Sequence, residues 1–321
     1  MPKTLLLMTL SLLSVASAQT STAAPVVQTR PTLSQTPLLP KSGEKTTLTL
    51  VLPQGVTTAP VVTVTGPANF KQSLKAVSLK GGAATYELSL AKDGTYSMSV
   101  AGQPTQRILV GQPKNRLDAT ILRLNFDGKN PLADLSGFGH DGKSVGEVKI
   151  VEGKVGKGLA FSNEASYVEF PRTAVLETPV QDMTMSIWVK SGDEKAYSDF
   201  FTKGDWNVLK TDAKNGSIDF FTGGWRRGEN EVAQPRDWVG NWHHLVGVVE
   251  GDTSRVYIDG KLIREAEVEG TLKYTSYPWN LGRNAEEPKG RGFTGTLDDV
   301  RIYPFALSSK EVEQLYQTSQ K

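Results

Sequence analysis

The stretch "WHHLVGVVEGDTSRVYIDGKLI", residues 242–263, decides the fold of this chain. Apolar side chains dominate its first half, and the pair Asp259-Gly260 interrupts its second half. An Asp-Gly pair favours a type I′ turn, because both central residues of that turn need a positive φ. We therefore expect a β-hairpin, with one strand over residues 255–258 and its partner over residues 261–267.

Two of the three histidines of the chain, His243 and His244, stand side by side in this stretch. Successive side chains of a strand point to opposite faces, so these two cannot reach one metal ion without a bulge. A zinc or copper site normally needs three or four nitrogen or sulfur ligands, and His140 is the only further candidate, since the chain has no cysteine. We therefore expect the histidines to satisfy hydrogen bonds inside a sheet, with a His-based metal protein as an alternative.

The same strand pattern continues on both sides of the hairpin, over residues 112–321. Apolar positions alternate with period two in several segments, which indicates strands: Leu122, Leu124 and Phe126, then Met185, Ile187 and Val189. Near the end of the chain, Ser308 and Glu311 form a capping-box pattern, and the apolar residues after them follow helical spacing. The sequence predicts a jelly roll of two packed sheets with one short C-terminal helix.

Residues 44–111 repeat the period-two alternation in shorter segments separated by glycine and proline, which predicts a small β-sandwich. The alternating positions are Leu48, Leu50, Leu52, Val62, Val64, Tyr86, Leu88, Leu90, Tyr96, Met98, Val100, Ile108 and Val110. The stretch "KDGTYSMSV" resembles the corner of immunoglobulin-like domains, in which a tyrosine hydroxyl binds the preceding turn. Tyr96 would be that tyrosine, and this resemblance implies a bacterial immunoglobulin-like domain.

The N-terminus predicts export. Residues 1–18 combine Lys3, an apolar run and the small-residue signature Ala16-Ser17-Ala18, the pattern of a signal peptide. The run is shorter than the roughly 20 residues that cross a bilayer, so we expect a protein that does not span the membrane. Residues 19–43 are rich in threonine, serine and proline, a composition that predicts a linker.

Composition is that of an ordinary globular protein, with 38% hydrophobic and 22% charged residues among 321. The formal net charge is +2, from 36 basic and 34 acidic side chains, without a long basic run. Such a balance gives no electrostatic basis for binding nucleic acid.

Three separated motifs carry a family resemblance over about residues 117–316. The opening stretch resembles the signature of concanavalin A-like, laminin G-like jelly-roll domains. "LADLSGFGHDGKSVG" is similar to the early Asp-x-Ser-Gly loop of that family, except that His140 stands where asparagine is usual. "TGTLDDVRIYPFALSSKEVEQLY" resembles its closing strand and helix. The expected fold class is therefore all-β: a small immunoglobulin-like β-sandwich followed by a laminin G-like jelly roll.

Calcium is the metal that the resemblance implies. In relatives of this fold the first loop and the last strand come close, and a structural calcium is often found between them. Calcium binds six to eight oxygen ligands from carboxylates and carbonyls. The corresponding ligands here are Asp134, Asp141, Asp298 and Asp299. The alternative is that these carboxylates only cap turns.

Catalytic motifs are missing from the sequence. Glucanases of this fold carry Glu-x-Asp-x-x-Glu, which does not occur, and a His-Glu-x-x-His helix is not present either. We therefore expect a protein that is not an enzyme. A carbohydrate-active enzyme of the concanavalin A-like fold with a rearranged motif is the alternative.

Binding is the expected function. Aromatic rings offer flat faces for sugars, and polar side chains supply directional hydrogen bonds. The candidate ligand contacts are Trp206, Trp225, Arg226, Arg227, Asn230, Asp237 and Trp238. The sequence thus predicts an exported protein of a bacterial cell envelope, in the periplasm or at the cell surface, that binds envelope glycans or other envelope proteins. Exposed strand edges would also allow homo-oligomers.

Overall fold

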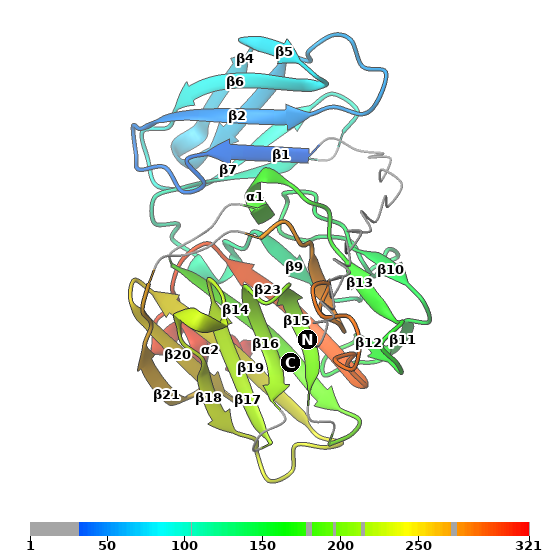
Figure 1. Cartoon of the computed structure of the whole chain (residues 1–321). Coiled ribbons are helices and arrows are strands. Elements are labelled where there is room, and N and C mark those ends of the chain that lie inside the picture. Colours follow the sequence, from blue (N-terminus) through cyan, green and yellow to red (C-terminus); the bar gives the residue numbers. More distant parts are fainter. Residues whose placement is uncertain are drawn as a thin grey trace, which may run out of the picture.

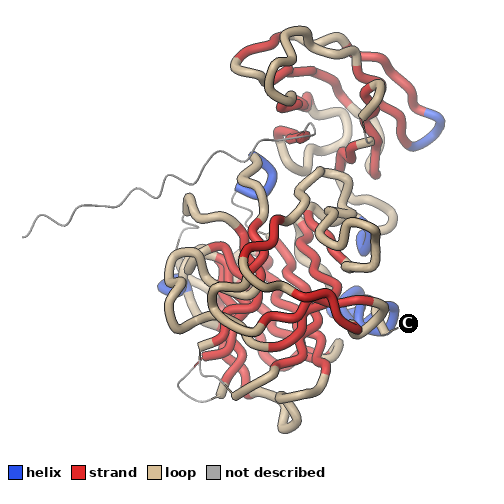
Figure 2. The backbone as a smooth tube through the Cα atoms, turned by 90° about the vertical axis from the view of Figure 1, so that its right-hand side faces the viewer, coloured by secondary structure: helices blue, strands red, loops and turns tan. Residues whose placement is uncertain are grey.

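The computed structural model describes residues 32–103, 105–177, 182–194, 197–212, 216–270 and 275–320. These residues form two β-sandwiches, a smaller one built from the first part of the chain and a larger one built from the rest (Figure 1). Figure 2 shows the two units after a 90° turn, with strands as the main regular secondary structure of each. The predicted signal peptide and residues 19–31 of the predicted linker lie outside the described residues.

The smaller sandwich consists of two antiparallel four-stranded sheets, in the orders β1-β2-β6-β5 and β4-β3-β7-β8. Its elements are β1 (Thr32–Thr36), β2 (Lys45–Val51), β3 (Val62–Gly66), the 3-10 turn η1 (Pro67–Asn69), β4 (Phe70–Leu74), β5 (Ser78–Lys80), β6 (Ala83–Ser89), β7 (Gly94–Val100) and β8 (Gln106–Val110). The predicted alternating positions fill its core, apart from the half-buried Val100. The Tyr96 hydroxyl donates to the Lys92 carbonyl at 2.8 Å, which confirms the predicted turn contact.

The smaller sandwich begins earlier than the composition suggested. Residues Thr32–Thr36, which the sequence assigned to the linker, form β1 and pair with β2. Leu33 is buried in the core, and Gln35 on the same face is also buried. Proline and threonine around these two positions hide an alternation that is too short to recognise in the sequence.

The larger sandwich has a seven-stranded sheet, β10-β13-β22-β15-β16-β17-β18, packed against an eight-stranded sheet, β11-β12-β23-β14-β19-β20-β21, in which β9 also pairs with β23. Its elements are the 3-10 turn η2 (Arg116–Asp118), β9 (Leu122–Leu124), β10 (Lys143–Val145), β11 (Lys149–Glu152), β12 (Lys157–Phe161), β13 (Tyr167–Glu169), α1 (Ala174–Glu177), β14 (Met183–Ser191), β15 (Ser198–Lys203), β16 (Asn207–Asp212), β17 (Ser217–Thr222), the 3-10 turn η3 (Trp225–Arg227), β18 (Asn230–Ala233), β19 (Trp242–Glu250), β20 (Thr253–Ile258), β21 (Lys261–Glu267), β22 (Trp279–Leu281), β23 (Gly295–Tyr303) and α2 (Ser309–Thr318). A core cluster of apolar side chains fills the space between the two sheets. The all-β prediction with sandwich sheets is confirmed.

The local signals of the sequence are also confirmed. Asp259 and Gly260 both have positive φ, 52° and 77°, and join β20 to β21. The Ser308 hydroxyl accepts from the Glu311 amide, and the Glu311 side chain accepts from the Ser308 amide, so α2 begins with a capping box. Among the described helices, none has the length and apolar character needed to cross a bilayer.

Strand β8 connects the two sandwiches, because its side chains pack into both hydrophobic cores. Ile108 and Val110 belong to the core of the smaller sandwich, while Leu109 between them belongs to the core of the larger one. The side chain of Gln35 on β1 makes two hydrogen bonds to the backbone of Leu109. Its amide donates to the Leu109 carbonyl at 2.6 Å, and its oxygen accepts from the Leu109 amide at 2.9 Å. The Arg107 amide of β8 donates to the Gly137 carbonyl of the larger unit at 2.8 Å. The junction is therefore a packed, hydrogen-bonded contact.

Candidate functional site

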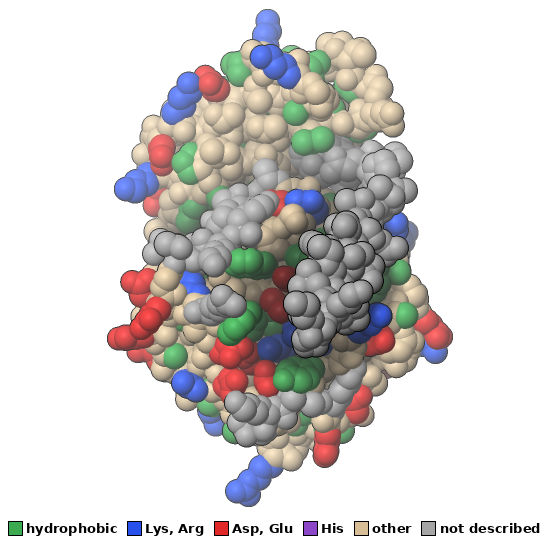
Figure 3. Space-filling view, in the orientation of Figure 1, with side chains coloured by type: hydrophobic (Ala, Val, Ile, Leu, Met, Phe, Trp, Pro, Cys, Tyr) green, Lys and Arg blue, Asp and Glu red, His purple; other side chains and the backbone are tan. Residues whose placement is uncertain are grey.

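A row of charged side chains crosses four neighbouring strands of the seven-stranded sheet. The register pairs Asp199 of β15 with Lys210 of β16, Lys210 with Asp219 of β17, and Asp219 with Glu231 of β18. Leu209, next to Lys210 in β16, belongs to the core between the sheets. Because successive side chains alternate in direction, the charged row lies on the outer face of the sheet. Figure 3 shows acidic and basic side chains gathered on this side of the larger sandwich.

Two carboxylates of the row are buried and lack hydrogen bonds. Asp199 and Asp219 are both 0% exposed, and in the described part of the protein neither oxygen of either side chain has a hydrogen-bond partner. Burial raises the pKa of each carboxyl from 3.8 to about 7, even though positive charges nearby act in the opposite direction. Buried polar groups are nearly always hydrogen-bonded, so two such carboxylates on one sheet face indicate a functional site.

Lys210 stands between these carboxylates. Its Nζ lies 3.3 Å from Asp212 Oδ2 and 3.4 Å from Asp219 Oδ2. Burial lowers the pKa of Lys210, but the surrounding carboxylates outweigh burial and raise it overall. The ammonium group is therefore held in its charged form.

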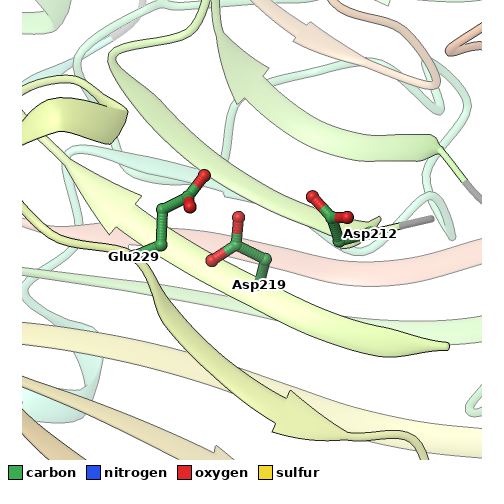
Figure 4. Close-up of side chains that lie close together, drawn as sticks. All are labelled: Asp212, Asp219 and Glu229. Atoms are coloured by element: carbon green, nitrogen blue, oxygen red, sulfur yellow. The ribbon is translucent and has the colours of Figure 1, made fainter. Parts of the chain in front are cut away.

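Asp212, Asp219 and Glu229 bring one carboxylate oxygen each to within 4.8 Å of one another. Figure 4 shows these three carboxylates on the same side of the sheet. Burial is also the main reason that the pKa of Glu229 is raised. Such a group of oxygens can hold a cation, and the ammonium of Lys210 already contacts two of the three side chains.

A second group of side chains borders the row near β15. Arg291 Nη1 donates to Asp205 Oδ1 at 2.9 Å. The ring of Tyr197, which is 41% exposed, lies 5.7 Å from the guanidinium of Arg291 and 5.8 Å from the ammonium of Lys210. Tyr197 thus offers an aromatic surface beside two cations at the border of the charged row.

Trp206 and Trp225 lie together at the ends of β16 and β17. The Gly224 amide donates to the Trp206 carbonyl at 3.1 Å, and a Cβ at Gly224 would lie 3.2 Å from the Trp206 ring. Gly224 also has φ +97°, so a glycine is needed here for two reasons. Trp225 follows at once and is 52% exposed, while Trp206 is half-buried. Four residues separate Trp206 from Lys210, about 13 Å along an extended strand.

Two other predicted ligand contacts, Arg227 and Asn230, have structural partners instead. Arg227 is buried, and its guanidinium donates to the backbone carbonyls of Gly251 at 3.2 Å and Gly270 at 3.3 Å. Asn230 Nδ2 donates to the carbonyl and hydroxyl of Ser254 at 3.1 and 2.8 Å. These contacts hold loops of the sandwich together, so neither side chain is presented to solvent.

Trp238 is buried in the core and stacks on the ring of His243, with centroids 5.8 Å apart. The side chain of Asp237 is exposed and lies 3.7 Å from His243 Nε2. The side chain of Arg226 lies outside the described part of the protein. Of the seven predicted ligand contacts, Trp206, Trp225 and Asp237 therefore remain candidates, because their side chains are exposed or half-buried at the surface.

The predicted calcium ligands bind backbone and side-chain donors of the protein. Asp134 is buried and accepts from four backbone amides and from the Ser136 hydroxyl, and its own amide donates to Asp141 Oδ1 at 2.7 Å. Asp298 Oδ2 accepts from the amides of Lys154 and Val155 at 2.8 and 3.1 Å.

Asp299, the fourth predicted ligand, accepts twice from the guanidinium of Arg301, at 2.9 and 2.7 Å. Among the described residues, the four predicted calcium ligands do not form a group whose ligand atoms lie within 4.8 Å of one another. The turn-capping alternative thus accounts for their contacts, and calcium binding stays a prediction.

The neighbouring histidines point to opposite faces of β19, as expected. His243 stacks on the core residue Trp238, and its Nδ1 lies 2.9 Å from Asp259 Oδ2. His244 stacks on Trp188 at 5.0 Å, and its Nε2 lies 2.9 Å from the Ser186 hydroxyl.

His140, the third histidine, lies elsewhere and contacts the Ile121 carbonyl and the Thr173 hydroxyl, both at 2.8 Å. Burial lowers the pKa of His244 to about 4, so this ring is neutral at ordinary pH. The three imidazoles have separate partners and do not form a common metal site.

The charged row itself was missed in the sequence. The segments "SDFF", "LKTD" and "SIDFF" each place a charge among apolar residues, which is the only signal that each contains. Asp199 and Asp219 flank Lys210 only because β15, β16 and β17 pair in one particular register. Such long-range pairing is not visible in local patterns.

Comparison with known proteins agrees with the architecture. Residues 162–313, within the larger sandwich, match the model of the concanavalin A-like lectin/glucanases superfamily. No curated protein matches the chain.

Three solved structures are similar in fold. The binding domain of Paraclostridial Mosquitocidal Protein 1 is 19% identical with a TM-score of 0.53, covering 63% of this chain and 52% of that one. The receptor-binding domain of the botulinum neurotoxin C/D mosaic serotype is 14% identical with a TM-score of 0.51, covering 63% and 51%. The third is a structure of botulinum neurotoxin type C, whose cell entry is described as dependent on interaction with two ganglioside molecules. It is 16% identical with a TM-score of 0.50, covering 64% of this chain and 53% of that one.

The aligned part of the chain therefore spans about half the length of these structures. At these identities the likeness concerns the fold alone. The larger sandwich has a concanavalin A-like jelly-roll fold, which it shares with binding domains.

Proposed function

We propose that this chain is an exported cell-envelope protein that binds glycans through the outer face of its seven-stranded sheet. The observation that carries the proposal is the pair of buried carboxylates, Asp199 and Asp219, whose oxygens accept no hydrogen bond, on a face bordered by the ring of Tyr197. Sugar hydroxyls are donors that would satisfy these carboxylates. The fold neighbours support a binding function, since they are binding domains.

The arrangement of the face supports an extended ligand. The charged row would hydrogen-bond to one part of a glycan, and Trp206 and Trp225 would stack on another part about 13 Å away. A ligand that contacts both regions must be an oligosaccharide. Because Asp199 and Asp219 are fully covered, the side chains over them must move when the ligand enters.

A glycan array, followed by affinity measurements on the glycans that bind, tests this proposal. Asp199→Asn and Trp225→Ala are expected to weaken binding at least about tenfold, because a charge-assisted hydrogen bond or a stacking face is lost. Asp252→Asn and Ile150→Ala are the matched controls, since they change an exposed carboxylate and an exposed apolar side chain of the other sheet. Unchanged binding in both site variants would reject this face as the site.

Location and assembly belong to the same proposal. The predicted signal peptide would be removed after Ala18, and the smaller sandwich would act as an immunoglobulin-like spacer. N-terminal sequencing of the protein from an envelope fraction is expected to begin at Gln19, whereas a start at Met1 would contradict export. Isolation of native envelope complexes tests for binding to envelope proteins or to further copies of this chain, and a solitary monomer would contradict such assembly.

Glycan cleavage is the second candidate function. Glycosidases use two carboxyl groups on one face, and Asp199 and Asp219 lie two strands apart, about 10 Å between their backbones. However, an acid and a base need different pKa values, and burial raises both of these pKa values to about 7. Release of reducing ends from a bound glycan, abolished by Asp219→Asn, would favour cleavage over binding.

A further inference from the structure

We infer that the charged face selects glycans that carry free amino groups over neutral and acidic glycans. This inference rests on the proposed function, because it names the ligand class of the same face. It depends on the balance of charge on that face, on the positions of its two cations, and on the carboxylate that neither cation contacts.

The face carries more negative than positive side chains. Among the described residues, the carboxylates that interact electrostatically here are Asp199, Asp205, Asp212, Asp219, Glu229 and Glu231. The cations in this set are Lys210 and Arg291. Within this described set, six carboxylates and two cations give an excess of four negative charges when all are ionised. A carboxylate or sulfate of an acidic glycan would be repelled here.

The two cations of the protein are already engaged. Lys210 lies at 3.3 Å from Asp212 and 3.4 Å from Asp219, and Arg291 donates to Asp205 at 2.9 Å. Asp199 is left with two oxygens that accept no hydrogen bond, although it is 0% exposed. A neutral sugar hydroxyl would donate one hydrogen bond to this carboxylate. A ligand ammonium would donate up to three hydrogen bonds and also supply the missing positive charge.

An ammonium fits this face better than a metal ion does. A calcium ion takes six to eight oxygen ligands, whereas Asp212, Asp219 and Glu229 are the three carboxylates grouped here. The Lys210 ammonium contacts two of these carboxylates, so the protein itself already pairs this chemistry with an amino group. Tyr197 borders the face, and aromatic rings also attract ammonium groups.

The charge of the whole chain does not produce the same selectivity. Its formal net charge is +2, which would weakly repel a cationic glycan. Selective binding of an amino glycan must therefore come from a local acidic face.

A matched pair of probes tests the inference. The tetramer of β-1,4-linked glucosamine and its fully N-acetylated counterpart differ only in the acetyl groups that remove the positive charges, and tetragalacturonic acid is the acidic probe. In titration calorimetry at pH 7, with a chelator present, we expect the glucosamine tetramer to bind at least about tenfold more tightly than the acetylated tetramer. The acidic tetramer is expected not to bind. The preference should shrink as salt is added, because exposed charges are screened.

Variants separate a local site from general attraction. Asp199→Asn and Glu229→Gln are each expected to weaken the glucosamine tetramer more than the acetylated tetramer, so that the preference for the glucosamine tetramer falls to about twofold or less. Glu229 is exposed, so its variant keeps the test valid if Asp199→Asn fails to fold. Asp252→Asn, which removes one exposed charge elsewhere, is expected to change neither affinity.

The outcomes distinguish the amino-group selectivity from the proposed glycan binding on which it rests. Equal or tighter binding of the acetylated tetramer would overturn the amino-group selectivity and leave glycan binding intact. Binding of the acidic tetramer through Asp199 and Glu229, or binding that requires a divalent metal, would also overturn it. A protein that binds no glycan on the array would reject the proposed function itself.

Discussion

Replacing Asp199 by asparagine should make the protein more stable at alkaline pH. Burial raises the pKa of this carboxyl from its ordinary 3.8 to about 7 in the folded protein. Between those values the folded chain keeps a proton that the unfolded chain has lost, so the stability that the protonated group provides below pH 4 falls as the pH rises to about 7. Asparagine does not titrate, and the variant does not undergo this loss.

The size of the effect follows from the same two pKa values. Each pH unit between them corresponds to about 1.4 kcal/mol in the free energy of unfolding, so the full interval is about 4 kcal/mol. From pH 5 to pH 8 the advantage of Asp199→Asn over the wild type should therefore grow by about 3 kcal/mol.

The assay is urea unfolding at pH 5, 6, 7 and 8, followed by tryptophan fluorescence. All six tryptophans lie between Trp188 and Trp279, so fluorescence reports on the larger sandwich. Asp134→Asn is the matched control, because this buried carboxylate accepts several backbone amides and its loss should lower stability at every pH tested. A difference between Asp199→Asn and wild type that does not change with pH would refute the reasoning.

Three further predictions concern the larger sandwich. Gly247→Ala should lower the free energy of unfolding by about 2 kcal/mol in urea unfolding, because the new Cβ would lie 2.2 Å from the Phe220 ring. Gly128→Ala, where the new Cβ would make only ordinary contacts at 3.5 Å or more, should have little effect, and equal effects would contradict the packing argument. Ser308→Ala should cost about 1 kcal/mol in the same assay through loss of the helix cap, and no change would mean that the helix end contributes nothing. If calcium binds the four predicted aspartates, calcium should raise and a chelator lower the melting temperature, and an unchanged value would remove that site.

Features that depend on near neighbours were predictable from the sequence. The Asp259-Gly260 turn and the Ser308 cap each follow from the conformational needs of two to four residues. Strand β1 was missed, because Leu33 and Gln35 give too short an alternation in a segment rich in threonine and proline.

The candidate site could be predicted only in part. Trp206 and Trp225 were proposed as ligand contacts from residue type; Trp225 is exposed and Trp206 is half-buried, and their contact with a ligand stays a prediction. Arg227 has the same chemical character as a ligand contact, but its position inside the fold turns it toward backbone carbonyls. Asp199 and Asp219 are separated by twenty positions, and their common site arises only from the pairing of three strands.

Strand β8 makes the junction between the two sandwiches a rigid one. Its side chains alternate between two hydrophobic interiors, and Gln35 fastens the Leu109 backbone in both directions. A force on a glycan bound at the proposed site would be transmitted through these hydrogen bonds and would not be taken up by a flexible linker. If the outer face of the seven-stranded sheet binds a glycan as proposed, this face would therefore keep a fixed orientation relative to the smaller sandwich, and several copies attached to one surface would present their glycan sites in the same direction.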